Sequence, residues 1–180
     1  MNLSARQKKT VLKTIRISEE LDGILEKDAK VRKTSVNALI YSIIGKYAEW
    51  DRYTEKFGHI TIPTSLFRAL LELIDEKALA TLAERVSVEL TNEIISFWFK
   101  KINLESLLQF FSIACQYGNA GEIEIENEGH NYAITVYHQC GKKWSIWLQH
   151  YTNKAIRSVV KVMPQFESTE STLTIKFEVP

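Results

Sequence analysis

The sequence is poor in proline, glycine and cysteine. Its 180 residues include 3 Pro and 7 Gly, which argues against a long disordered segment and against a turn-rich all-β fold. The two cysteines, Cys115 and Cys140, cannot build a disulfide framework and favour a reducing, cytoplasmic location. Apolar residues make up 45% and charged residues 25% of the chain, as in an ordinary soluble globular protein.

Long apolar runs and recognisable catalytic motifs are also missing. No apolar run approaches the roughly 18 residues of a membrane-spanning helix, so no membrane partner is expected. The first residues have no apolar stretch behind their charges and therefore do not resemble a secretory signal. We find no Ser-His-Asp set and no paired catalytic carboxylates, and we expect neither an enzyme nor a cofactor.

Acidic residues are absent from the first 18 positions, which hold 5 basic side chains. Residues 1–58 carry 12 Lys and Arg against 8 Asp and Glu, a balance of +4, whereas residues 59–180 carry 11 against 14, a balance of −3. A basic N-terminal region followed by a mildly acidic remainder of the chain favours a polyanionic partner for the N-terminal region. Charge alone equally allows a solvated tail, and residues 1–10 are predicted to form a flexible basic arm.

Residues 11–47 carry the most informative pattern, which predicts one short strand and two helices. Residues 11–17 alternate, so that Ile15 and Ile17 lie on one face of a half-buried strand. Ser18 is the predicted N-cap of the first helix and Ser35 that of the second. The apolar stripe of the second helix continues to Phe57, which predicts a helix over 36–57 shared by both parts of the chain.

The predicted strand has two unpaired edges and no neighbouring strand in residues 1–58. An isolated edge is a template for pairing, and a twofold axis would pair it with its own copy in a homodimer, with a higher oligomer left open. The expected dimer core is made of apolar side chains from the strand and both helices: Ile15, Ile17, Leu21, Leu39 and Ile43. The alternative is a helical hairpin whose N-terminal strand pairs with the second domain.

The outward face of such a two-stranded ribbon suits the major groove of double-stranded DNA. Leu12, Thr14 and Arg16 supply apolar, hydroxyl and guanidinium groups of the kinds that contact base edges. The start of the second helix offers free N–H groups to phosphates near Ser35 and Asn37. Basic side chains would add attraction that does not depend on sequence, namely Lys8, Lys9 and Lys33.

These residues resemble the ribbon-helix-helix superfamily of DNA-binding proteins, the class of the Arc and methionine repressors. The resemblance lies in the strand Lys-Thr-Ile-Arg-Ile-Ser over 13–18, in the following Glu-Glu-Leu, and in Thr-Ser-Val-Asn-Ala-Leu-Ile over 34–40. It covers about a fifth of the chain. It implies a dimeric β-α-α module over 11–58, base reading by Leu12, Thr14 and Arg16, and a phosphate clamp at Ser35. Lys33 departs from the pattern, because members often have Gly in the turn between the helices.

Residues 59–180 are predicted to form a second α+β domain, a helical block followed by β-β-α-β. Helical stripes run to residue 85, from 91 and from 103, and strands are expected over 122–126, 132–138 and 172–179. A helix that begins near Gly141 bears an aromatic stripe of Trp144, Trp147 and Tyr151. Such a stripe usually forms core, although it could line a pocket for an apolar ligand.

The sharpest candidates for chemistry in this domain are His138 and Cys140, which stand two residues apart near a strand end. Imidazole and thiolate together suit zinc, nickel or copper. A histidine at a strand end with no metal is the simpler interpretation, and no metal is expected.

Together these features predict a homodimeric transcriptional regulator, expected as a repressor, that reads DNA through its N-terminal ribbon. The second domain would sense a small-molecule or protein effector or add an assembly interface. The alternative is an antitoxin-like or adaptor protein whose second domain binds a protein partner.

Overall fold

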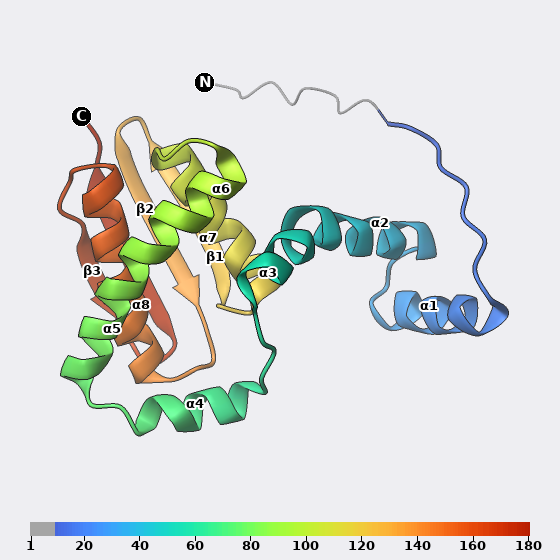
Figure 1. The fold of residues 1–180 in the computed structure, drawn as a ribbon, viewed down its shortest axis with the longest axis horizontal. Coiled ribbons are helices and arrows are strands. Elements are labelled where there is room, and N and C mark those ends of the chain that lie inside the picture. Colours follow the sequence, from blue (N-terminus) through green and yellow to red (C-terminus); the bar gives the residue numbers. More distant parts are fainter. Residues whose placement is uncertain (1–9) are drawn as a thin grey trace. The chain divides into compact units, whose positions relative to one another are not determined.

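The computed structural model describes residues 10–180, and the chain divides into two compact units, residues 1–47 and 48–180. Helices and one four-stranded antiparallel sheet make up the described part, in agreement with the predicted α+β class (Figure 1). The division falls before the predicted domain boundary at residue 58. Its physical reason is aromatic packing, because Tyr53 lies edge-on to Trp98 and Phe57 edge-on to Phe97, and all four belong to the second unit.

The first unit contains helices α1 (Glu19–Val31) and α2 (Val36–Lys46), which pack against each other. Both begin at the predicted N-caps. The Ser18 hydroxyl accepts the Leu21 N–H at 3.3 Å, and the Ser35 hydroxyl accepts the Ala38 N–H at 3.1 Å. These bonds satisfy N–H groups that a helix start would otherwise leave unpaired. Sequence alone therefore located both helix starts.

Residues 10–18, in contrast, form no strand in the single chain. Within the described residues, no backbone hydrogen bond joins 11–17 to another segment. The described structure thus begins with helices, and the predicted β-α-α order is not seen in one chain (Figure 1). A strand whose expected partner is a second copy has nothing to pair with here, so its pairing stays a prediction.

The backbone is helical without a break from Val36 to Phe57, but the predicted helix is not regular. A π-helical turn, η1 (Tyr47–Asp51), separates α2 from α3 (Arg52–Phe57). Gly58 ends α3 with a left-handed φ of 67°, as its position after the last apolar residue predicted. The apolar period indicates a helix but carries no signal for the extra residue of a π turn.

The helical part of the second unit continues with five further segments after α3: α4 (Thr64–Glu72), α5 (Glu76–Leu90), the π turn η2 (Thr91–Ile95), α6 (Ser96–Phe99) and α7 (Leu104–Gly118). The sequence predicted a break between two helices at residues 85 to 91. This prediction is wrong, because α5, η2 and α6 follow one another without a loop. Asn103 caps α7 as predicted, and the Ser106 hydroxyl accepts the Asn103 N–H in return.

The sheet of the second unit contains one strand more than predicted. The expected hairpin is β1 (Glu122–Glu128) with β2 (Asn131–Tyr137), then come α8 (Lys142–Val159), β3 (Gln165–Ser168) and β4 (Thr172–Glu178). The order is β1-β2-β4-β3, with all neighbours antiparallel. Strand β3 was not predicted from the sequence, because it has only four residues and is defined by its pairing with β4.

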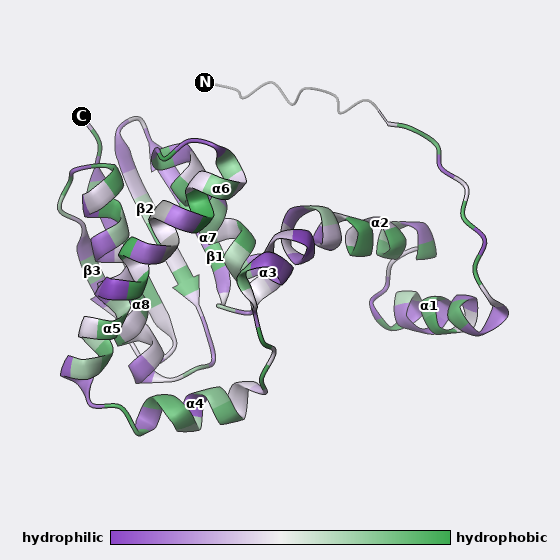
Figure 2. Ribbon diagram, in the orientation of Figure 1, coloured by the Kyte–Doolittle hydropathy of each residue, from purple (hydrophilic) through white to green (hydrophobic). Residues whose placement is uncertain are grey.

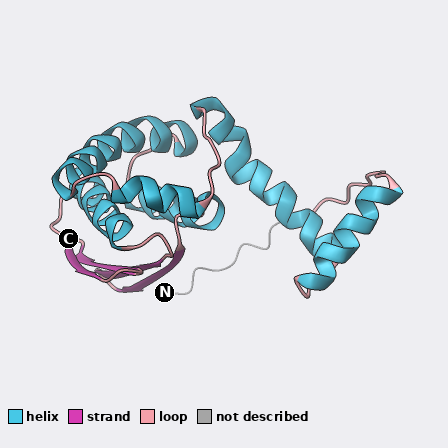
Figure 3. Cartoon of the chain, turned by 90° about the horizontal axis from the view of Figure 1, so that it is seen from below, coloured by secondary structure: helices cyan, strands magenta, loops and turns pink. Residues whose placement is uncertain are grey.

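One face of the sheet is covered and the other is polar. Figure 3 shows the strands of the second unit as one layer with helices on one side. The apolar side chains on this side form the core with α7 and α8, for example Ile134, Leu173 and Ile175, each 0% exposed. The opposite face carries Glu124 and Lys176 among polar neighbours, so the alternation along the strands matches the two environments.

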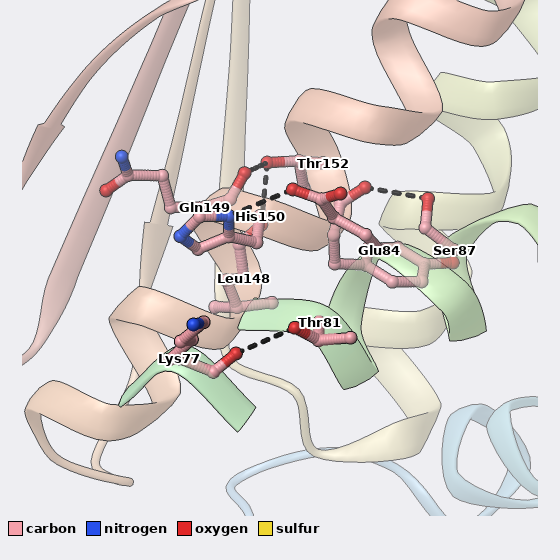
Figure 4. A network of polar contacts seen from close by, with 9 residues as sticks. Lys77, Thr81, Glu84, Ser87, Leu148, Gln149, His150 and Thr152 are labelled. Carbon is pink, nitrogen blue, oxygen red and sulfur yellow. Dashed lines mark hydrogen bonds and ion pairs between the residues drawn. The ribbon is translucent and has the colours of Figure 1, made fainter. Parts of the chain in front are cut away.

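Helix α5 packs along α8, and polar contacts join the two helices (Figure 4). The buried Ser87 hydroxyl donates to the Tyr151 carbonyl at 2.8 Å, and His150 Nδ1 lies 3.4 Å from a Glu84 oxygen. Among the described residues, no helix combines the length and the apolar character that a membrane crossing requires.

Candidate functional sites

The predicted base-reading residues lie on the extended segment before α1. Leu12, Thr14 and Arg16 are all exposed, and the Leu12 side chain is 93% exposed. Lys8 and Lys9, two of the predicted phosphate contacts, lie outside the described residues. The structure of one chain therefore presents the three candidate side chains to solvent, with no second copy to align them.

The turn between α1 and α2 holds the other predicted phosphate contacts. Lys33 adopts a left-handed backbone with φ of 52°, and Ser35 and Asn37 are exposed at the start of α2. A left-handed residue is ordinarily glycine, because glycine has no Cβ to clash. Lys33 thus occupies a position whose backbone suits glycine, and it adds a positive charge beside the free N–H groups of the helix start.

The first unit leaves an unusually large share of its apolar side chains in solvent. Of the predicted dimer-core residues only Leu39 is buried, at 5% exposed. The others are half exposed or nearly so: Ile15 58%, Ile17 41%, Leu21 52% and Ile43 52%. Helix α2 in particular is hydrophobic over much of its surface (Figure 2). Large exposed apolar patches mark interaction sites in soluble proteins, so these side chains are candidates for such a site.

The second unit contains a partly open apolar cavity of about 230 Å³ between the covered face of the sheet and its helices. Aromatic side chains dominate its lining: Trp50, Trp98, Phe110, Trp144, Trp147 and Tyr151. The rings of Trp144 and Trp147 stack at 4.7 Å, and those of Trp147 and Tyr151 at 4.8 Å. The sequence stripe identified the last three residues. Sequence reasoning missed Trp50 of η1 and Trp98 of α6 as pocket residues, because only the tertiary fold brings them to the same cavity as the aromatic residues of α8.

Two polar groups of cavity-lining residues, Trp98 Nε1 and the Tyr151 hydroxyl, are buried and have no hydrogen-bond partner among the described residues. Burial raises the pKa of Tyr151 far above its ordinary value, so the phenol stays neutral. Other polar lining groups are satisfied internally. Trp144 Nε1 donates to the Ala120 carbonyl at 3.0 Å, and Thr152 Oγ1 donates to the Leu148 carbonyl at 2.7 Å.

His138 is buried at the end of β2 in a short chain of hydrogen bonds. The Ser145 hydroxyl donates to the Thr169 carbonyl at 2.7 Å, and its oxygen lies 2.9 Å from His138 Nε2. Since the single hydroxyl proton is already used, Ser145 accepts, and His138 carries its proton on Nε2. His138 Nδ1 is buried and has no hydrogen-bond partner in the part of the chain that the structure describes, and burial lowers the pKa of this imidazole.

The thiols show no sign of activation. Burial raises the pKa of Cys115 to about 11 and raises that of Cys140 as well. A neutral thiol is a poor nucleophile and a poor metal ligand. Among the described residues, no group of three or more His, Cys, Asp or Glu side chains is placed to hold a metal ion. The role of His138 that the geometry supports is therefore structural, through Ser145.

Comparison of the chain with protein-family models, curated proteins and solved structures gave no significant match.

Proposed function

We propose that the protein is a homodimeric, sequence-specific DNA-binding transcriptional regulator that uses residues 11–47. The observation that supports this most directly is the segment 11–17. It is extended toward solvent, carries no backbone pairing within the described residues, and precedes two well-capped helices with exposed apolar faces. Pairing with a second copy would satisfy the backbone and cover the apolar side chains at once.

The free energy available to such a dimer is substantial. Burying a Leu or Ile side chain fully contributes about 1.5–3 kcal/mol, and four of the predicted core residues are still about half exposed. Each therefore stands to contribute about 1 kcal/mol per copy on pairing. The two paired strands would then present Leu12, Thr14 and Arg16 together on the face away from the helices.

Oligomeric state is the first test. Ile43→Lys places a charge on the exposed face of α2, where a single chain tolerates it and a dimer core does not. We expect sedimentation analysis to show a dimer for the wild type and a folded monomer for this variant. The matched control is Ile60→Lys, since Ile60 lies in a loop of the second unit and is 83% exposed. A monomeric wild type at micromolar concentration would contradict the proposal.

DNA binding is the second test, with genomic fragments and a range of salt concentrations. Arg16→Ala should lower affinity for preferred fragments about 5- to 150-fold and leave non-specific binding nearly unchanged, because a bidentate base contact contributes about 1–3 kcal/mol. Lys33→Gly removes one charge at a backbone position that glycine prefers. It should weaken binding to all fragments alike and reduce the salt slope by about one. Absence of wild-type binding even at low salt would refute the function.

A further inference from the structure

Three basic side chains of the second unit gather around aromatic rings on its surface. The Lys56 ammonium lies 5.1 Å from the centre of the Phe97 ring, and that of Lys100 lies 4.6 Å from the same ring. The Arg52 guanidinium lies 4.4 Å from the centre of the Tyr53 ring, which in turn packs edge-on against Phe97. Arg52, Lys56 and Lys100 are all exposed and together are called the basic cluster.

The rings position these cations without neutralising them. Within the described part of the chain, none of the three forms an ion pair, although Glu55 lies three positions after Arg52 on α3, within reach on a helix. An aromatic ring attracts a cation but carries no net charge, so the positive charge and most of the N–H donors stay available. The basic cluster therefore presents three cations to an anion that comes from outside the chain.

The arrangement of the basic cluster opposes stability. Arg52 and Lys56 are four positions apart on α3, where like charges repel. The Lys56 and Lys100 ammonium groups lie at most about 10 Å apart, one Debye length at 0.1 M salt, so they repel as well. Lys100 also has a left-handed backbone with φ of 58°, which favours glycine. Local choices that oppose stability are expected at functional sites, and a bound polyanion would relieve the repulsion.

The basic cluster is a local feature of an acidic unit. Residues 48–180 carry 13 Lys and Arg against 17 Asp and Glu. The unit as a whole therefore repels a polyanion, and the basic cluster would determine where such a partner touches it.

We propose that the basic cluster is a second contact between this protein and the phosphate backbone of double-stranded DNA. The inference rests on the proposed function, because residues 11–47 would hold the DNA and the covalent link would raise its local concentration at the second unit. Phosphate contacts of this kind fix the orientation of a protein on the duplex and carry no sequence information.

The test measures binding of the full-length chain to labelled duplexes, one preferred and one unrelated, by fluorescence anisotropy over a range of salt concentrations. The double variant Lys56→Gln/Lys100→Gln should lower the slope of log K against log salt by about 1.8 for both duplexes, because each phosphate contact contributes about 0.9. At 0.1 M salt its affinity for both should fall roughly 10- to 60-fold.

Two further variants separate a DNA contact from changes in net charge or folding. The matched control Lys77→Gln/Lys154→Gln removes the same two charges from exposed positions of α5 and α8 and should leave the slope nearly unchanged. Lys100→Gly should lower the slope by about 0.9 and stay folded, since glycine suits this backbone conformation. Thermal melting followed by circular dichroism establishes that each variant is folded.

The outcomes distinguish this proposal from the proposed function. If the wild type binds DNA and the slope of Lys56→Gln/Lys100→Gln equals that of the control, the basic cluster is no DNA contact and only this inference is overturned. A wild type that binds neither duplex at low salt overturns both. If Arg16→Ala keeps the full sequence preference while the double variant loses slope, base reading by Arg16 fails and the contact at the basic cluster is supported.

Discussion

Replacing Tyr151 by Phe should stabilise the protein, although it removes a polar group from the core. Tyr151 is 5% exposed, and its hydroxyl has no hydrogen-bond partner among the described residues. The phenyl ring that remains can keep the stacking on Trp147, whose ring lies 4.8 Å away. The substitution therefore removes a desolvated hydroxyl without removing a hydrogen bond or an aromatic contact.

The expected change in the free energy of unfolding follows from the cost of burying a hydroxyl group without a hydrogen bond. Leaving a buried polar group unpaired costs about 1–3 kcal/mol, and a small cavity at the vacated oxygen offsets part of the gain. We expect the free energy of unfolding to rise by about 1 kcal/mol, or the melting temperature by roughly 2–4 °C for a chain of this size. If the hydroxyl were paired in the native protein, the same substitution would lower the free energy of unfolding by about 1 kcal/mol. The sign of the measured change therefore distinguishes an unpaired hydroxyl from a paired one.

Urea denaturation followed by circular dichroism measures this difference, with equal m-values required for the comparison. Tyr117→Phe is the matched control, because the Tyr117 hydroxyl donates to Glu49 at 2.9 Å on the surface. That variant should be neutral or slightly less stable than the wild type. A loss of 1 kcal/mol or more in Tyr151→Phe would refute the assignment of an unpaired hydroxyl.

Two further predictions concern local structure in the second unit. Burial lowers the pKa of His138 below its usual 6.5, so the unfolded chain binds a proton that the folded chain resists, and stability should fall as the pH drops below about 6.5. His138→Gln, which keeps a donor for Ser145, should flatten this slope in denaturation curves between pH 7 and pH 5, and an unchanged slope would show that another group is responsible. Asn103→Ala should lower the free energy of unfolding by about 1 kcal/mol because it removes the side-chain bond to the Ser106 N–H at 2.9 Å. Equal stability of this variant would mean that water caps α7 as well as the side chain does.

The sequence by itself determined the starts of three helices and the position of the β1–β2 hairpin. Ser18, Ser35 and Asn103 cap helices through bonds to residues three positions away, and the strands alternate apolar and polar residues along themselves. Both signals are local and can be read without knowing the fold. The same reasoning placed Leu12, Thr14 and Arg16 on one face, and their use in DNA binding remains a prediction because it requires a second copy.

Tertiary structure decided the rest. Strand β3 exists through its pairing with β4, and the π turns η1 and η2 interrupt helices whose apolar period gives no sign of them. Trp98 and Tyr151 lie more than 50 positions apart in the sequence. Only the tertiary packing buries Trp98 Nε1 and the Tyr151 hydroxyl with no hydrogen-bond partner among the described residues. Whether a buried polar group is satisfied depends on every element that surrounds it, and this is information that no local pattern carries.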